Sequence, residues 1–353
     1  MLRSLALTNF RSYKTIELSF ENNLTVIAGP NAVGKTNLLE SVFVASTTKS
    51  FRASDTELIN TDENYYRIVA QFDEDKVELS LAHSQEGHTK QLRLNNKKQS
   101  LRSLLGRNPV TLFEPHDMSL FEGSPEKRRK YLDTVLCQID PHYAEALHLY
   151  KRALKQRNSL LHTSKTARAN VSEDELFIWD IQLSEHAQPI VRSRRLLIEE
   201  LSPVIQSIYN EIAGGKTAIR LVYEPNVDTP TKDILKVLLE HRARDKVAGF
   251  TTVGPHRDNF TMAFKTGDIV NTASRGETRT AVLAMKIAEM RLIQDRLHKS
   301  PILLLDDVFS ELDSNRRQHL MELIARQQTL LTTTEVDDNI PKNSYTIDLS
   351  GVH

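Results

Sequence analysis

The chain contains, at residues 24–36, the stretch Leu24-Thr25-Val26-Ile27-Ala28-Gly29-Pro30-Asn31-Ala32-Val33-Gly34-Lys35-Thr36. Its first five residues are nearly all apolar and predict a buried strand, whereas residues 36–45 carry apolar side chains at helical spacing. The glycine-containing loop between them matches the pattern G-x-x-x-x-G-K-[ST] at every fixed position. Because that pattern is informative only between a strand and a helix, the context here supports it.

A loop of this kind binds phosphate groups. Its backbone N–H groups and the N-terminus of the following helix surround phosphate oxygens, Lys35 reaches the β- and γ-phosphates, and the Thr36 hydroxyl is a ligand of Mg²⁺. We therefore expect ATP with Mg²⁺ as the bound nucleotide. The candidate nucleotide-binding residues are Gly29, Pro30, Asn31, Ala32, Val33, Gly34, Lys35, Thr36 and Asn37.

A second half of the site is predicted where the apolar run 302–305 ends in Asp306 and Asp307. Asp306 is the expected carboxylate on the Mg²⁺ side. By the period-two alternation of the strand, Asp307 points differently from Asp306, and we expect it to position or deprotonate an attacking water. The predicted catalytic residues are therefore Lys35, Asp306 and Asp307. The two halves are 271 residues apart, which indicates an insertion between them.

The 353 residues exceed the length typical of one domain, and the pattern along the chain changes twice. Residues 1–28 predict two or three strands, and residues 66–112 an antiparallel sheet. Residues 126–214 have helical periodicity, interrupted by prolines at 141, 189 and 203. After residue 249 the chain returns to a strand (260–264), a helix (276–298), a strand (302–305), a helix (313–326) and a strand (329–332). We predict a discontinuous α/β head from residues 1–115 and 246–353 and a helical insertion from residues 116–245.

Composition excludes several classes of protein. The 46 basic residues equal the 46 acidic ones, so the chain does not hold nucleic acid by bulk charge. No apolar run is long enough to span a bilayer and the N-terminus lacks a secretion-signal core, which predicts a cytosolic protein. Cys137 is the only cysteine, so neither an intrachain disulfide nor a cysteine-based zinc site is expected.

A local basic region nevertheless lies between residues 126 and 168, where ten basic and four acidic residues give a net charge of +6. Lys151 and Lys155 are one helical turn apart, which indicates a basic helix face. The alternative is an ordinary solvated surface. The candidate DNA-binding residues are Lys127, Arg128, Arg129, Lys151, Arg152, Lys155 and Arg157.

The order of motifs resembles the ABC ATPase head. Ser274-Arg275-Gly276-Glu277 opens a long predicted helix before the acidic strand, as the ABC signature does, and Ser310-Glu311-Leu312-Asp313 follows that strand. The resemblance implies a mixed sheet with flanking helices and an antiparallel β subdomain. It also implies that Ser274 and Gly276 of one copy contact the γ-phosphate held by a second copy.

Further stretches resemble the RecF family. They are Asn9-Phe10-Arg11-Ser12-Tyr13, Lys49-Ser50-Phe51-Arg52, Phe113-Glu114-Pro115-His116-Asp117, the run from Gly123 to Arg129, Lys155-Gln156-Arg157-Asn158, Gly254-Pro255-His256-Arg257-Asp258 and the run from Leu304 to Asp313. The resemblance implies an ATP-dependent homodimer that binds duplex, gapped or junction DNA. It further implies RecR-like and RecO-like partners in loading a recombinase, with slow ATP hydrolysis that DNA stimulates.

The chain departs from the usual ABC pattern in three places. Glu277 stands where related signatures often carry Gln, no glutamine lies between residues 99 and 138, and Thr332-Thr333-Thr334 occupies the position of the switch histidine. Glu114 and His116 are the candidates to replace the missing glutamine. These departures favour slow turnover and leave open an alternative, a scaffold that binds ATP structurally and recruits partners. A long coiled-coil tether and a transporter subunit fit the spacing and motifs less well.

Overall fold

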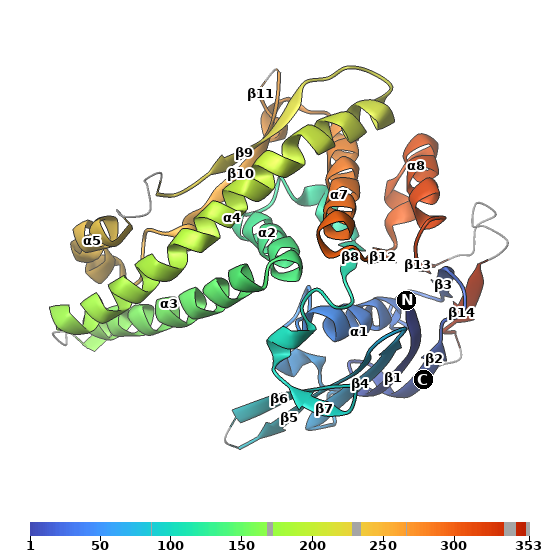
Figure 1. The fold of residues 1–353 in the computed structure, drawn as a ribbon, viewed down its shortest axis with the longest axis horizontal. Helices are drawn as coiled ribbons and strands as arrows, with labels where there is room; N and C mark the ends of the chain where they lie inside the picture. The colour runs from blue at the N-terminus through green and yellow to red at the C-terminus, as the bar shows by residue number, and fades with distance from the viewer. Residues whose placement is uncertain (86, 168–171, 228–233, 266, 335–343, 351–353) are drawn as a thin grey trace. The chain divides into compact units, whose positions relative to one another are not determined.

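The computed structural model describes residues 1–85, 87–167, 172–227, 234–265, 267–334 and 344–350. The chain divides into two compact units, Met1–Met118 with Lys286–His353, and Ser119–Met285. Figure 1 shows both, and each is described by itself below.

One sheet of the first unit is antiparallel, with the strand order β2-β1-β4-β5-β6-β7. Its strands are β1 (Leu2–Phe10), β2 (Tyr13–Ser19), β4 (Tyr65–Phe72), β5 (Lys76–Ser84), β6 (Gly87–Leu94) and β7 (Lys97–Gln99). Along β4, buried Tyr66, Ile68, Ala70 and Phe72 alternate with more exposed neighbours, as expected for a sheet with one face in the core. The predicted antiparallel sheet is confirmed for residues up to 99.

The other sheet of this unit is parallel, with the order β14-β3-β13-β12-β8. Its strands are β3 (Leu24–Ala28), β8 (Val110–Phe113), β12 (Ile302–Asp306), β13 (Thr329–Thr333) and β14 (Tyr345–Asp348). Assigning residues 110–112 to the antiparallel sheet was wrong, because β8 pairs with β12. Parallel pairing brings the carboxyl ends of β3, β12 and β13 to one edge, which positions the site described below.

Helix α1 (Lys35–Thr47) contacts strands of both sheets, and Figure 1 shows it beside them. Its buried residues occupy more than one face and include Leu38, Leu39, Val42 and Phe43. Burial on both sides explains why α1 is apolar around most of its circumference. The unit also contains α8 (Ser314–Ile324) and the short 3₁₀ helices η1 (Thr56–Leu58), η2 (Leu101–Leu104), η3 (Pro115–Ser119) and η6 (Val308–Glu311).

The second unit is mostly helical. It contains α2 (Pro125–Ile139), α3 (Pro141–Ala167), α4 (Glu173–Ala213), α5 (Ile234–Ala248), α6 (Ile269–Thr272), η5 (Pro255–Arg257) and a small sheet of β9 (Ile219–Glu224), β10 (Asn259–Phe264) and β11 (Gly267–Asp268). Helix α7 (Arg275–Leu297) begins in this unit and ends in the first. The predicted interruptions at Pro189 and Pro203 were wrong, since α4 continues through both. Helix α4 packs along α3 (Figure 1), and its apolar face is buried. Such tertiary packing stabilises a helix even where a proline removes a backbone hydrogen bond.

The second boundary of the insertion differs from the prediction. The first predicted boundary, after residue 115, lies close to the observed one after Met118, but the chain leaves the helical unit after Met285 rather than at 246. Strand β10 pairs along its whole length with β9, and Asp258 accepts hydrogen bonds from Tyr223 and Asn226. These long-range pairs hold residues 246–285 in the helical unit.

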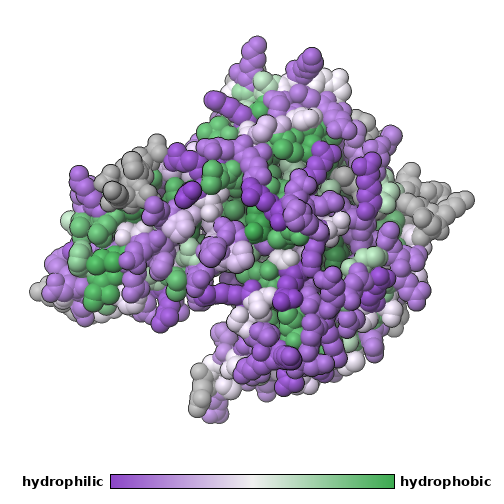
Figure 2. All heavy atoms as spheres, in the orientation of Figure 1, coloured by the Kyte–Doolittle hydropathy of each residue, from purple (hydrophilic) through white to green (hydrophobic). Residues whose placement is uncertain are grey.

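Not every apolar side chain of the helical unit is buried. Ile178, Val247 and Phe250 are exposed, and Figure 2 shows hydrophobic surface near the end of the unit that carries α5. Within the part of the chain that the structure describes, no helix combines the length and apolar content needed to cross a bilayer.

Candidate nucleotide-binding site

The predicted phosphate loop lies between β3 and α1, as the sequence indicates. Gly34 has φ of 109° and precedes α1, where the described residues supply no side-chain cap to the helix N-terminus. A Cβ atom at Gly34 would lie 2.8 Å from the Tyr13 hydroxyl, so the position requires glycine for both backbone and packing reasons. The first N–H groups of α1 are therefore suited to bind an anion, which is what a phosphate group requires.

Lys35 folds over its own loop. Its Nζ donates to the carbonyl oxygens of Gly29, at 2.6 Å, and Pro30, at 2.9 Å. Because an ammonium group has three N–H donors, Lys35 can exchange its hydrogen bonds to these carbonyl oxygens for hydrogen bonds to phosphate oxygens. The Lys35 side chain is buried, so water screens the attraction between its charge and a bound phosphate only weakly.

The two predicted halves of the site meet. Thr36 Oγ1 lies 3.0 and 2.9 Å from the two carboxylate oxygens of Asp306, although 270 residues separate them. A hydroxyl and a carboxylate are oxygen ligands of the kind Mg²⁺ prefers, and the metal usually keeps several waters besides. The donor set thus fits a nucleotide-borne Mg²⁺.

Asp307 adopts a left-handed backbone conformation, with φ of 49°, and follows the end of β12. Its side chain therefore takes its direction from this turn, and the predicted continuation of strand alternation was wrong. The Asp307 N–H donates to Thr332 Oγ1 at 3.0 Å, and the Thr332 hydroxyl lies 2.8 Å from Asp306 Oδ1. Thr332 thereby connects both acidic residues to the end of β13.

Thr332 is predicted from the sequence only as part of the run at the position of the switch histidine. Three other residues near the loop have no site role predicted from the sequence, although two of them, Ser12 and Tyr13, lie in a stretch that resembles the RecF family. Tyr13 donates its hydroxyl to the Gly34 carbonyl at 3.0 Å. Ser12 accepts from Asn37 at 2.8 Å. No local pattern identifies these contacts, because they join the β1–β2 turn to a loop that is distant in sequence.

The third omitted residue, Glu40, organises the arginines beside the loop. Its fully buried carboxylate accepts from Arg11 at 2.9 and 3.0 Å, from Arg52 at 2.9 Å and from Ser50 at 2.5 Å. Burial by itself raises the pKa of Glu40, but the hydrogen bonds from Arg11, Arg52 and Ser50 outweigh it and hold that pKa below its usual value. The carboxylate is therefore charged, and it holds two arginines beside α1.

The segment after β8 carries the predicted replacements for the missing glutamine. Glu114 directly follows β8, and its N–H donates to Asp117 Oδ2 at 2.9 Å. Asp117 in turn lies 3.3 Å from buried Lys286 of α7. Burial alone lowers the pKa of Lys286, yet Asp117 and Glu289 raise it to about 12. The roles expected of Glu114 and His116 stay predictions.

The predicted signature residues Ser274 and Gly276 lie at the start of α7 and belong to the other unit, so they are described separately. Ser274 and Glu277 form a reciprocal cap: the Ser274 N–H donates to Glu277 Oε2 at 2.8 Å, and the Glu277 N–H donates to Ser274 Oγ at 3.3 Å. The Ser274 hydroxyl also donates to Glu277 Oε2, at 2.8 Å. The hydrogen bonds from Ser274 lower the pKa of Glu277, which keeps the carboxylate charged. In the D-loop-like stretch, the side chains of Ser310 and Glu311 lie outside the described set.

The predicted DNA-binding residues do not share one environment. Lys127, Lys151, Arg152 and Lys155 are exposed, and Lys151 lies 3.2 Å from Asp133. Arg129 is half-buried and donates to the Asp258 carbonyl. The DNA-binding role of the four exposed residues stays a prediction.

Two of the predicted DNA contacts were wrong. Arg157 is fully buried and bonds Asp180 at 2.7 Å and Asp245 at 2.6 Å. Arg128 is also buried and donates to three backbone carbonyls before α2, those of Leu120, Phe121 and Gly123. Both guanidinium groups are used to hold the helical unit together, because a buried charge must be paired.

The fold and site define an ATPase head of the ABC type, in which a parallel sheet presents a phosphate loop and an acidic strand end, and a helical unit interrupts the chain. A family model described as the RecF/RecN/SMC N terminal domain matches residues 1–339.

Comparison with known proteins narrows the class. The DNA replication and repair protein RecF of Agathobacter rectalis is 36% identical over 99% of this chain and 96% of its own length. The RecF protein of Moorella thermoacetica is 40% identical over 95% of this chain and 90% of its own. A solved structure of the recombination mediator protein RecF-ATP in the RecFOR pathway matches with a TM-score of 0.86 and 29% identity, covering 98% of this chain and 95% of that one. The chain belongs to the RecF family.

Proposed function

We propose that this protein is an ATP-dependent DNA-binding protein of recombinational repair. Two copies close on ATP, the closed form binds duplex, gapped or junction DNA, and slow hydrolysis releases it. The observation that carries the proposal is the contact between Thr36 and Asp306, which unites a phosphate loop with an acidic strand end. Its relatives named for DNA replication and repair, and the RecF-ATP structure of the RecFOR pathway, support the same role.

In this proposal each residue at the loop has a defined task. The N–H groups at the start of α1 and the Lys35 ammonium bind the nucleotide phosphates, while Thr36 and Asp306 hold Mg²⁺. When bound, that ion neutralises charge on the β- and γ-phosphates. Asp307 positions the attacking water. Thr332 holds both acidic residues in place, because its hydroxyl donates to Asp306 and accepts from the Asp307 N–H.

The second copy would supply Ser274 and Gly276 at the start of α7, so that ATP is sandwiched between two chains. Hydrolysis that removes the γ-phosphate would weaken this contact and open the dimer. DNA would lie against the exposed basic residues Lys127, Lys151, Arg152 and Lys155. RecR-like and RecO-like proteins are the proposed partners, since the solved RecF-ATP structure belongs to the RecFOR pathway.

The first test is the molecular mass of Asp307→Asn by light scattering, with ATP and Mg²⁺ against ADP and Mg²⁺. Loss of the proposed base traps the ATP-bound state, so we expect a monomer with ADP and a dimer with ATP. Adding Ser274→Arg should abolish the dimer while ATP binding persists. A monomer in all conditions would contradict closure of two copies on ATP.

The alternative function, an ATP-bound scaffold with little DNA-coupled turnover, is favoured by one observation. Glu277 holds the Ser274 hydroxyl and adds a negative charge where a γ-phosphate would approach. Steady-state ATP hydrolysis with and without gapped DNA separates the two functions. Stimulation by DNA supports the switch, whereas an unchanged rate together with partner binding supports the scaffold.

A further inference from the structure

Phe250 is an aromatic residue that the helical unit leaves on its surface. It follows α5 and is 44% exposed, and Figure 2 shows hydrophobic surface near that end of the unit. The guanidinium carbon of Arg257 lies over the ring, 5.1 Å from its centroid. Arg257 is exposed, donates to the Thr251 carbonyl at 3.2 Å and forms no ion pair with a carboxylate in the described part of the chain. An aromatic ring and an unpaired cation therefore meet at one surface position.

The loop that carries this pair, residues 249–258, is anchored between α2 and α3. Arg129 of α2 donates to the Asp258 carbonyl at 2.8 Å. Asn158 of α3 accepts from the Thr251 N–H at 2.8 Å. Both ends of the loop are thus fixed, and the ring and the guanidinium group are held in place before a ligand binds.

Exposed cations of α3 adjoin this loop. Lys155 is three residues before Asn158, so it lies on the side of α3 that contacts the loop. Lys165, farther along the helix, donates to the Ala248 carbonyl at 3.0 Å. Residues 246–257 contain no acidic side chain. The surface around the ring is therefore positive, and it attracts phosphate groups.

A second exposed pair of the same kind, Phe177 with Arg242, differs in its charge. Phe177 is 40% exposed, and the guanidinium carbon of Arg242 lies 5.6 Å from its ring centroid. Arg242 also bonds Asp180 at 2.7 Å and Glu173 at 2.8 Å. The exposed acidic run 173–175 precedes Phe177, and its carboxylates repel phosphate groups. The two rings offer similar apolar area, but acidic groups surround the pair at Phe177.

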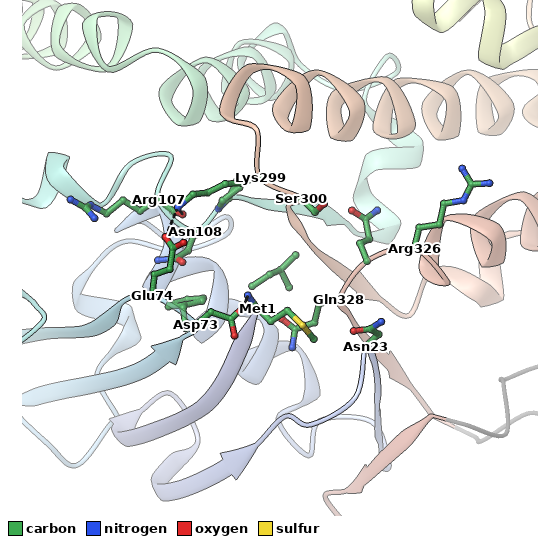
Figure 3. Close-up of a pocket in the computed structure, with 14 residues that line it drawn as sticks. Met1, Asn23, Asp73, Glu74, Arg107, Asn108, Lys299, Ser300, Arg326 and Gln328 are labelled. Atoms are coloured by element: carbon green, nitrogen blue, oxygen red, sulfur yellow. Dashed lines mark hydrogen bonds and ion pairs between the residues drawn. The ribbon is translucent and has the colours of Figure 1, made fainter.

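A cavity of about 340 Å³ in the first unit also has basic residues in its lining, and there they are paired (Figure 3). Lys299 donates to Glu74 at 3.1 Å, and Arg107 lies 3.4 Å from Asp75. The Arg326 side chain points away from the cavity in Figure 3. Because carboxylates neutralise its cations, this cavity does not attract phosphate as the surface around Phe250 does.

Single-stranded DNA matches what the surface around Phe250 offers. Its phosphates suit the cations, and its bases are flat rings that stack on an aromatic side chain or on a guanidinium group. In a duplex the bases are stacked on one another, so their faces are not available to a protein side chain. Stacking accepts any base, because every base has a π-face. Such a ring therefore distinguishes unpaired from paired bases without reading a sequence.

We propose that Phe250 and Arg257 form a stacking site for an unpaired base of single-stranded DNA, and that the surrounding cations bind the adjoining phosphates. These cations are Lys155 and Lys165 of α3 and Arg129 of α2. The inference rests on the DNA-binding function proposed above, and it names the part of a gap or junction that the helical unit holds.

Fluorescence anisotropy on the full chain, with ATP and Mg²⁺, tests this site. The probes are a labelled blunt duplex, the same duplex with a single-stranded thymidine extension, and the same duplex with an extension of abasic nucleotides, which keep the phosphates and lack the bases. We expect the unmodified chain to bind the thymidine extension at least about fivefold more tightly than the abasic one. Phe250→Ala should remove this difference, and Phe250→Trp should keep it, because an indole ring also stacks.

Two further variants serve as controls. Phe177→Ala removes a similarly exposed ring that also lies beside an arginine, and it should keep the difference between the two extensions. Lys155→Ala should weaken binding of both extensions alike, because it removes a phosphate contact and no stacking contact.

Each result decides the proposal. Binding of the blunt duplex without any difference between the two extensions would overturn the stacking site and leave the DNA-binding function standing. Retention of the difference in Phe250→Ala, or its loss in Phe177→Ala, would also overturn the assignment to Phe250. Failure of the unmodified chain to bind any of the probes would contradict the DNA-binding function itself, and the stacking site with it.

Discussion

At the scale of single residues, Gly254 shows how tightly the helical unit is built. Its φ is +126°, and a Cβ atom there would lie 2.6 Å from the Tyr150 hydroxyl, which itself contacts His256 Nδ1 at 2.6 Å. Burial lowers the pKa of His256 to about 4, so the ring stays neutral in this network. The network supports a structural role for the Gly254–Asp258 segment.

Gly254→Ala should lower the free energy of unfolding by at least about 2 kcal/mol, because it adds backbone strain and a steric clash. Urea denaturation followed by circular dichroism measures this loss. Gly215→Ala is the control, since a Cβ atom at Gly215 meets nothing within 4 Å. Equal stability of the two variants would show that the Tyr150 contact adapts without cost.

The Thr332 hydroxyl bonds both acidic residues of the site. Thr332→Val removes the hydroxyl shared by Asp306 and the Asp307 N–H, so we expect kcat for ATP hydrolysis to fall about tenfold while ATP affinity changes little. Thr25→Val and Thr111→Val are matched controls, because their buried hydroxyls have no partner among the described residues. Their steady-state rates should match that of the unmodified chain.

At the scale of elements, α3 carries a solvent-exposed basic residue and a buried one within a single turn. Lys155 is exposed, whereas Arg157 bonds two buried carboxylates. A periodic basic pattern indicates a helix but does not tell which charges face a partner helix. The acidic residues that pair with Arg157, Asp180 and Asp245, lie on α4 and α5. Which residues pair therefore depends on how these helices pack against α3.

Arg157→Ala should cost roughly 3–5 kcal/mol of unfolding free energy, since it removes the charge partner of buried Asp245 and one of the two arginines that pair with buried Asp180. Lys155→Ala should change stability by less than about 0.5 kcal/mol and should weaken DNA binding instead. Denaturant titration and DNA-binding anisotropy on both variants test this contrast. Destabilisation by Lys155→Ala comparable to that of Arg157→Ala would contradict it.

At the scale of the whole molecule, the chain has no net charge, so DNA binding must come from a local surface. If two copies each meet about four phosphates, the logarithm of the affinity should fall with the logarithm of the salt concentration with a slope of about 7. Anisotropy of labelled duplex and gapped DNA with ATP, over a series of salt concentrations, measures the slope. Half that slope would indicate that a single copy binds.

The phosphate loop, the acidic strand end and the order of the main strands and helices could be predicted from the sequence, because they depend on local patterns of apolar, glycine and charged residues. Tertiary structure alone decided that β8 joins the parallel sheet and that β10 stays with the helical unit. It also decided that Arg157 is buried and that Glu40 and Thr332 support the site. Each of these depends on contacts between residues far apart in the chain, and a local pattern does not specify which distant group satisfies a strand edge or a buried charge.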